Sequence, residues 1–243
     1  MEKELRIRAF RAPNDPETCR KYIIGHRKVL ENHGINKVTS STEDWVNSTC
    51  VFVVVVETMN GEKLYGGVRI HAYEGENFLP MQEAIADMDS RIHYVIQRYA
   101  ANGTGELCGL WNSLEVAGLG IGSLFPIRAG IVIAEQAGLN SLFFLCSPLT
   151  VRFNKWVGSR IITEIGNEGT FYYPKLDLLA TAVVLEDAIT VEHAHPREKQ
   201  KIFFMRNNLN FTTVEKSPFK NVYVTVHYDL TLADIKMSEF SIQ

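Results

Sequence analysis

The 243-residue chain lacks two features that would point to particular classes of protein. The apolar stretch Val116–Ile127 stops at Arg128, too short to cross a bilayer. Basic residues number 25 against 28 acidic ones, and the net charge of −3 offers no positive surface to phosphate backbones. We therefore expect neither a membrane span nor a nucleic-acid partner.

Cysteine pairs and metal-ligand clusters are also missing. The four cysteines are scattered without a C-x-x-C pair: Cys19, Cys50, Cys108 and Cys146. This spacing indicates neither a disulfide framework nor a zinc module. The His193-Ala194-His195 triplet has no third ligand nearby and is expected at the surface, so no metal is predicted. With no apolar leader after Met1, a reduced cytoplasmic protein is the expectation.

What remains is an ordinary globular composition, 46% apolar and 22% charged, with strands and helices in alternation. A strand over Leu5–Phe10 precedes a helix that starts near Asn14 and ends at Gly34. The runs Cys50–Glu57 and Leu64–Tyr73 flank an Asn-Gly turn and predict a hairpin. Residues 77–100 carry apolar spacings typical of short helices.

The next segment predicts a βαβ unit. A strand over Glu106–Val116 leads into the glycine turn Gly118–Ser123, and Pro126 must lie in the first turn of the helix that follows. A buried strand over Leu142–Cys146 and a helix over Pro148–Val157 complete the unit.

Beyond this unit, strands are expected over Leu178–Leu185 and Val222–Leu230, with a charged helix over Arg197–Asn208 between them. No repeat or flexible linker interrupts the chain. We predict an α/β fold in one domain, 1–243, with a core at about 4–160. Residues 161–243 are expected as a C-terminal elaboration of the same sheet.

The glycine turn Gly118–Ser123 is the strongest chemical signal. Glycine exposes backbone amides, and the first N–H groups of a helix have no partner within it, so the two together favour an anion such as pyrophosphate. A tight turn that needs glycine for packing alone remains the alternative. No Lys ends the turn, which excludes a P-loop.

A dinucleotide site is a weaker match. Ser123 replaces the third glycine of G-x-G-x-x-G, and the next strand ends in Cys146-Ser147 without the acidic residue that binds ribose. An NAD(P)-dependent oxidoreductase is therefore kept as a rival function.

The order of elements and the segment Ala117–Gly122 resemble the N-acetyltransferase superfamily of GNAT fold. That resemblance implies a mixed central sheet flanked by helices, and a cradle for the pyrophosphate of acetyl-CoA or acyl-CoA. The residues it assigns to this cradle are Val116, Gly118, Leu119, Gly120, Ile121, Gly122 and Ser123. It also implies that a backbone N–H near Val116 stabilises the oxyanion. Ala117 departs from the family's Arg or Gln.

Three short segments resemble the branch of acyl-homoserine-lactone synthases and N-acyl amino acid synthases. They are Arg27–Leu30, Gly66–Ile70 and Glu106–Leu110. In the last of these the acidic residue is kept, but Gly109 replaces an Arg. The branch implies a small-molecule amine as acceptor and either CoA or acyl carrier protein as donor.

Acyl transfer to an amine needs a base, and Glu106 is the candidate, acting through water. A solvent-facing carboxylate is the alternative for Glu106. Glu115 is a weaker candidate for the base, because it lies nearer the glycine turn, where a carboxylate would repel the phosphate. Asn154 stands where the superfamily has the Tyr that protonates the thiolate, so water, Tyr172 or Tyr173 must serve.

Two residues are candidates for binding the acceptor. Arg69 suits a carboxylate, although a salt bridge within the sheet would explain it as well. Tyr172 lies in the aromatic run Phe171–Leu179, which either packs as core or lines a pocket for an acyl chain or an aromatic acceptor.

The sequence thus predicts an N-acyltransferase that moves an acetyl or longer acyl group from a thioester directly to a primary amine. A catalytically silent acyl-CoA sensor is the alternative, motivated by Ala117, Gly109 and Asn154. The oligomeric state is not predicted.

Overall fold

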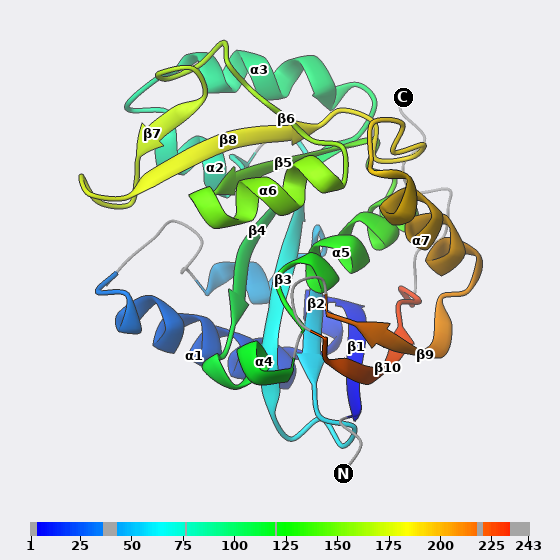
Figure 1. Ribbon diagram of the computed structural model, residues 1–243. Helices are drawn as coiled ribbons and strands as arrows, with labels where there is room; N and C mark the ends of the chain where they lie inside the picture. The colour runs from blue at the N-terminus through cyan, green and yellow to red at the C-terminus, as the bar shows by residue number, and fades with distance from the viewer. Residues whose placement is uncertain (1–3, 36–42, 76, 120, 218–220, 234–243) are drawn as a thin grey trace.

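In the part of the chain that the structure describes, ten strands form one mixed sheet at the centre of the molecule (Figure 1). The computed structural model describes residues 4–35, 43–75, 77–119, 121–217 and 221–233, with the backbone alone at 117–119. The strand order is β6-β8-β5-β4-β3-β2-β1-β10-β9, with β7 also paired to β8. The α/β fold and the mixed central sheet are as predicted.

The strands are β1 Glu4–Arg11, β2 Val51–Glu57, β3 Leu64–Ala72, β4 Thr104–Asn112, β5 Ser141–Cys146, β6 Arg160–Ile161, β7 Thr170–Tyr172, β8 Leu179–Leu185, β9 Asn210–Lys216 and β10 Tyr223–Asp229. The α-helices are α1 Pro16–Asn32, α2 Pro80–Ile85, α3 Arg91–Ala100, α4 Leu114–Leu119, α5 Leu124–Gln136, α6 Pro148–Trp156 and α7 Pro196–Asn207. Short 3-10 turns cover Ala12–Asn14 and Asp44–Asn47.

Strands β1 to β4 form an antiparallel meander, and β5 joins β4 in parallel. The parallel step needs a crossover, which α4 and α5 supply. The C-terminal part of the chain supplies strands to both edges of the sheet: β6 to β8 lie beyond β5, and β10 pairs in parallel with β1. The strands after residue 160 thus belong to the same sheet as those before it, while the division into a core and a C-terminal elaboration stays a prediction.

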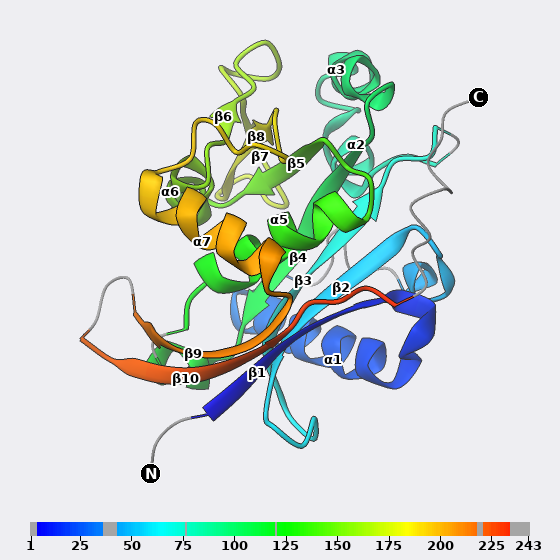
Figure 2. The same cartoon turned by 90° about the vertical axis from the view of Figure 1, so that its right-hand side faces the viewer.

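Each face of the sheet packs against its own helices (Figure 2). Helices α5, α6 and α7 cover one face, where Leu107 and Phe144 point into a large apolar core. Helices α1, α2 and α3 cover the other face, where Phe143 packs with α2 and α3, and Tyr22 with Val53. Side chains of β4 and β5 therefore divide between two cores, as strand alternation requires.

The strand predicted to reach Val116 is shorter than expected. β4 ends at Asn112, and Leu114–Leu119 form the short helix α4 (Figure 1). The Ser113 N–H bonds the Tyr65 oxygen at 2.7 Å, and this is the last ladder bond to β3. The pairing of β4 with β5 ends earlier, at Glu106. The chain therefore has no neighbouring strand beyond Ser113 and forms the helix α4.

Across the described ranges, no helix combines the length and apolar character needed to cross a membrane.

Candidate functional site

Strands β4 and β5 pair only at their first three residues, Thr104–Glu106 against Ser141–Phe143. Beyond Glu106, β4 continues along β3, while β5 continues along β8 to Cys146. The two strands diverge in Figure 1. We call this point of divergence the fork. It leaves backbone N–H and C=O groups of both strands without a strand partner in the middle of the sheet, where such groups are ordinarily paired.

A β-bulge follows the fork on β4. Gly67 on β3 pairs with Trp111 on β4, and Arg69 pairs with Cys108. Two residues of β4, Gly109 and Leu110, therefore lie opposite the single β3 residue between Gly67 and Arg69. Gly109 has φ +60°, the conformation that glycine adopts most easily. A Cβ at this position would lie 2.8 Å from the Tyr22 hydroxyl. The glycine that replaces the branch's Arg is therefore required by the local backbone and its packing.

Glu106 lies at the base of the fork and is buried, with 2% exposure. Its Oε2 accepts a 2.6 Å hydrogen bond from the Met81 N–H in the first turn of α2. Burial raises the pKa of Glu106 to about 8, although this bond and the charge of Arg69 act in the opposite direction. A carboxyl with this pKa can hold or release a proton near neutral pH. The alternative of a solvent-facing carboxylate is excluded.

Arg69 is fully buried on β3, on the same face as Glu106. Its guanidinium carbon lies 4.3 Å from the centre of the Trp45 ring and 5.7 Å from that of Tyr22. Burial, reinforced by the charge of Arg69, lowers the pKa of His26 to about 4. The positive charge is thus held among aromatic rings and neutral imidazole.

Sequence reasoning missed Trp45, because it lies in the polar stretch 37–47, between the predicted helix that ends at Gly34 and the predicted hairpin. The short turn Asp44–Asn47 places this Trp in the core, with 5% exposure. A large aromatic residue within an otherwise polar stretch was the available signal.

On the opposite face, the N-cap of α5 lies beside Asn112, the last residue of β4, and α5 carries no acidic residue in its first turn. Ser123 is its N-cap and makes no side-chain bond to the helix; its hydroxyl instead accepts from Asn112 at 3.0 Å. A Cβ added at Gly122 would meet no atom of the described residues within 4 Å, and its backbone is not left-handed. Neither packing against the described residues nor backbone geometry therefore requires glycine at this position.

The other described residues of the predicted glycine turn do not all belong to a turn. Gly118 and Leu119 are helical, at the end of α4, and Ile121 is buried with 1% exposure. Gly120 lies outside the described residues. Val116 is in α4 rather than on a strand, and its N–H bonds the Ser113 oxygen at 3.1 Å. The prediction that Val116 offers its N–H from the strand to an oxyanion is therefore wrong in its placement.

Tyr172 is not brought to Arg69. It lies on β7 with 64% exposure, and β8, β5 and β4 separate β7 from β3. Its neighbour Phe171 is buried against α2 and α3, so the aromatic run splits into a core residue and an exposed one. Glu115 also lies away from Glu106: it is exposed and pairs with Lys63 at 2.6 Å.

Asn154, in the place of the superfamily's Tyr, is buried in α6. Its amide donates to the Cys146 sulfur at 3.1 Å and to the Thr150 oxygen at 3.2 Å. Both amide protons are therefore used within the protein and do not reach a departing thiolate. The part of the chain that the structure describes holds no group of three His, Cys, Asp or Glu residues suited to a metal ion.

Comparisons with known proteins place the fold. No family model matches the chain, and no curated protein matches it in sequence. Among solved structures, the chain is similar to FeeM, an N-acyl amino acid synthase from uncultured soil microbes. The TM-score is 0.58 at 15% identity, over 81% of this chain and 97% of that one.

Two acyl-homoserine-lactone synthases are also similar. LasI matches with a TM-score of 0.52 at 12% identity, over 75% of this chain and 89% of the other. BjaI, a CoA-dependent synthase solved with SAM and isopentyl-CoA, matches with a TM-score of 0.51 at 10% identity, over 83% and 89%. The GNAT-like fold is therefore confirmed, and the solved structures similar to this chain include both kinds of synthase that its short segments resemble.

Proposed function

We propose that the chain is an N-acyltransferase that moves an acetyl or longer acyl group from a thioester to a primary amine. The observation that carries this proposal is the fork, with an anion-favouring helix start on one face of the sheet and the buried Glu106 on the other. The fold neighbours, which are synthases of acylated amines, support it.

The donor is an acyl-CoA or acyl carrier protein, both of which end in a phosphopantetheine arm. In the proposed arrangement its phosphate lies at the start of α5, near Gly122 and Ser123, where the helix dipole favours negative charge. The narrow arm passes through the fork, and its amide groups pair with the open backbone groups of β4 and β5. The thioester then lies close to Glu106.

The acceptor approaches from the face of Glu106 and Arg69. Arg69 contributes a buried positive charge that suits an acceptor bearing a carboxylate, as an amino acid does. Ionised Glu106 takes a proton from the ammonium group through a water molecule, and the free amine attacks the thioester carbonyl carbon. The C–N bond forms and the C–S bond breaks.

Backbone N–H groups at the Gly109 bulge supply hydrogen bonds to the oxyanion in this proposal, in place of Val116. The departing thiolate takes its proton from water, because both amide protons of Asn154 are engaged. No covalent acyl-enzyme is needed, since burial raises the pKa of both Cys108 and Cys146 to about 12 and keeps these thiols neutral.

The test is to incubate the protein with acetyl-CoA and longer acyl-CoA thioesters and a panel of amines and amino acids. Release of free thiol is followed together with the mass of the N-acyl product. The proposal expects amine-dependent thiol release that Glu106→Gln largely removes. Tight thioester binding without release would identify a sensor instead, and NAD(P)-dependent absorbance change would identify an oxidoreductase.

A further inference from the structure

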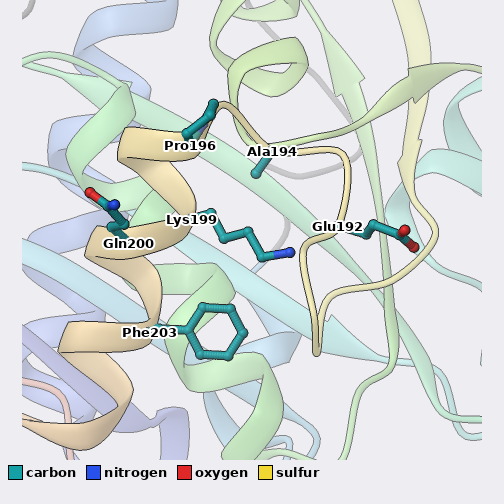
Figure 3. Close-up of a pocket in the computed structure, with 6 residues that line it drawn as sticks. All are labelled: Glu192, Ala194, Pro196, Lys199, Gln200 and Phe203. Carbon is teal, nitrogen blue, oxygen red and sulfur yellow. The ribbon is translucent and has the colours of Figure 1, made fainter.

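The pocket beside α7 (Figure 3), of about 560 Å³, lies on the opposite side of the sheet from Glu106. Its lining residues are Glu192, Ala194, Pro196, Lys199, Gln200 and Phe203. Ala194 belongs to the same apolar core as Leu107, whereas Glu106, the preceding residue of β4, bonds to α2 on the other face. The pocket therefore contributes no side chain to the surroundings of Glu106.

His71 lies directly opposite Glu106 in the ladder between β3 and β4. The pairing is regular here, because the bulge lies farther along, between Gly67 and Arg69. Directly opposed residues of an antiparallel pair point to the same face, with their Cβ atoms about 5 Å apart. The imidazole of His71 is therefore the β3 neighbour of the Glu106 carboxyl, and on β2 the residue opposite His71 is the apolar Val51.

Both side chains retain hydrogen-bonding capacity that the described residues do not use. The Nε2 atom of His71 is buried and has no partner among them. The Glu106 carboxyl accepts one bond, from the Met81 N–H to Oε2, and no described residue donates to its Oε1. A buried polar atom without a partner is uncommon in proteins, so Nε2 calls for an explanation.

The His71 ring carries no charge near neutral pH. Burial, together with the charge of Arg69, lowers the pKa of His71 well below its ordinary value. A neutral imidazole donates from one ring nitrogen and accepts at the other. With its proton on Nε2, His71 offers Glu106 one N–H donor and adds no second cation beside Arg69. Such a bond is strongest when the acceptor is ionised.

We propose that His71 is a positioning residue for Glu106, and that its Nε2–H donates a hydrogen bond to Oε1 of Glu106 when that carboxyl is ionised. The bond stabilises the carboxylate and fixes its orientation, and a lone pair remains for the water that carries the proton. The inference rests on the proposed function, in which ionised Glu106 takes a proton from the ammonium group of the acceptor. That one proton passes from the ammonium nitrogen to Glu106 through water, and His71 keeps its own proton throughout.

Other titratable and charged groups act on this pair from four elements: Arg69 on β3, Cys108 on β4, Cys146 on β5 and Glu83 on α2. Burial raises the pKa of both thiols to about 12, so they are neutral near neutral pH. Burial raises the pKa of Glu106 most, Glu83 raises it further, and the charge of Arg69 lowers it. A substitution of His71 leaves all four groups in place, so its effect on the titration of Glu106 reports on the imidazole.

Helices α1 and α3 carry titratable groups on the same face of the sheet. His26 and Tyr22 of α1 lie near Arg69, where burial lowers the pKa of the imidazole to about 4 and raises that of the phenol. Both are therefore uncharged near neutral pH. His93 of α3 contacts the Gln82 amide of α2 at 2.9 Å.

The experiment follows Glu106 by infrared spectroscopy of the purified protein, without substrate. The C=O stretch of its protonated carboxyl is identified as the band that Glu106→Gln removes, and its pH titration is recorded in the wild type, His71→Gln and His71→Asn. The amide nitrogen of Gln reaches the position of Nε2, whereas that of Asn reaches only the position of Nδ1. The pKa of Glu106 is therefore expected to be about one pH unit higher in His71→Asn than in the wild type, and close to the wild-type value in His71→Gln.

The same bond should affect the reaction. At pH 7, kcat/KM of His71→Asn is expected to be about tenfold below the wild type and to recover as the pH rises, while the affinity for CoA is unchanged. The matched control is His193→Asn, which removes an exposed imidazole from the loop before α7 and should titrate and react as the wild type does. Equal titration of Glu106 in the wild type and His71→Asn, or equal shifts in the Asn and Gln variants, overturns the proposal.

The wild type gives a test that does not depend on the folding of a variant. Nitrogen-15 NMR of the histidine rings, at a pH where Glu106 is ionised, should find the proton of His71 on Nε2, and a proton on Nδ1 overturns the proposal. An infrared shift without acyl transfer would count against the proposed function and leave the bond between His71 and Glu106 in place. Acyl transfer that Glu106→Gln removes and His71→Asn leaves unchanged at every pH would overturn the role of His71 alone.

Discussion

In the proposed function, the two faces of the fork recognise charge in different ways. At the start of α5 the proposed donors are backbone amides beside Gly122, a position where a Cβ would meet no atom of the described residues. On the other face the ionisable groups are the buried side chains of Glu106 and Arg69, and aromatic rings lie against Arg69. Substitutions at the start of α5 should therefore change ligand affinity alone. Substitutions of Glu106 or Arg69 should change both the rate of acyl transfer and the free energy of unfolding.

The largest effect is expected from Glu106→Gln. The amide keeps an acceptor for the Met81 N–H but cannot take a proton, so kcat should fall about 10³-fold with little change in affinity for CoA. Thiol release and calorimetry measure the two quantities. The matched control is Glu115→Gln, an exposed carboxylate whose loss should leave both values near wild type. Equal loss in the two variants would contradict a special role for Glu106.

The pH dependence should follow the same group. With a pKa of about 8, Glu106 is mostly protonated at pH 6 and half ionised at pH 8, so kcat/KM should rise about fiftyfold from pH 6 to pH 8. Stability should change in the opposite direction. The carboxyl titrates near 4.5 when unfolded and near 8 when folded, so its contribution to the free energy of unfolding decreases between these pH values.

Measurements of kcat/KM and denaturant titrations at several pH values across this range check the pH dependence of the rate and of the free energy of unfolding. Glu106→Gln should remove the part of each pH dependence that the Glu106 carboxyl causes. A wild-type rate that stays flat between pH 6 and pH 8 would show that a different group limits the reaction.

Gly109→Arg would introduce the residue that the resemblance of Glu106–Leu110 leads us to expect, yet it should destabilise this protein by about 2 kcal/mol. The backbone there is left-handed, and a Cβ would press against the Tyr22 hydroxyl and Arg69. Denaturant melts test this. Gly75→Arg, at φ +86° with open space around it, separates backbone strain from the clash. A fully stable Gly109→Arg variant would refute the packing around the bulge.

The smallest effect concerns the α5 side. Gly122→Asp should weaken CoA binding about tenfold, because it places a negative charge where a phosphate is expected, while Gly122→Asn of nearly the same shape should weaken it less. Both should melt as the wild type does, since the position is open. Identical affinities for Asp and Asn would place the phosphate elsewhere.

The sequence predicted most elements of this fold because their periodicity is local. The sequence did not predict α4. Strand β4 ends where its pairing with β3 and with β5 has ended, which the residues 113–119 do not themselves indicate. The same limit explains the misplacement of Val116, which was predicted to lie at the end of a strand over Glu106–Val116. Strand β9 was missed because its residues are mostly polar and face solvent at the sheet edge.

Among the site residues, Glu106 and Arg69 could be named from short motifs, but the rings around Arg69 could not. Trp45 meets Arg69 through the pairing of β2 with β3 and the packing of α1, which sequence spacing does not express. The same limit applies to Tyr172: the aromatic run left core packing and a pocket open, and strand alternation buries Phe171 and exposes Tyr172, whose role in binding stays a prediction.

A crystal structure with a non-hydrolysable acyl-CoA analogue tests the central claim most directly. The account predicts the pyrophosphate at the start of α5 by Gly122, the pantetheine arm between β4 and β5, and the acyl carbonyl on the face of Glu106. An analogue bound outside the fork, or with its acyl group on the α5 face of the sheet, would contradict it.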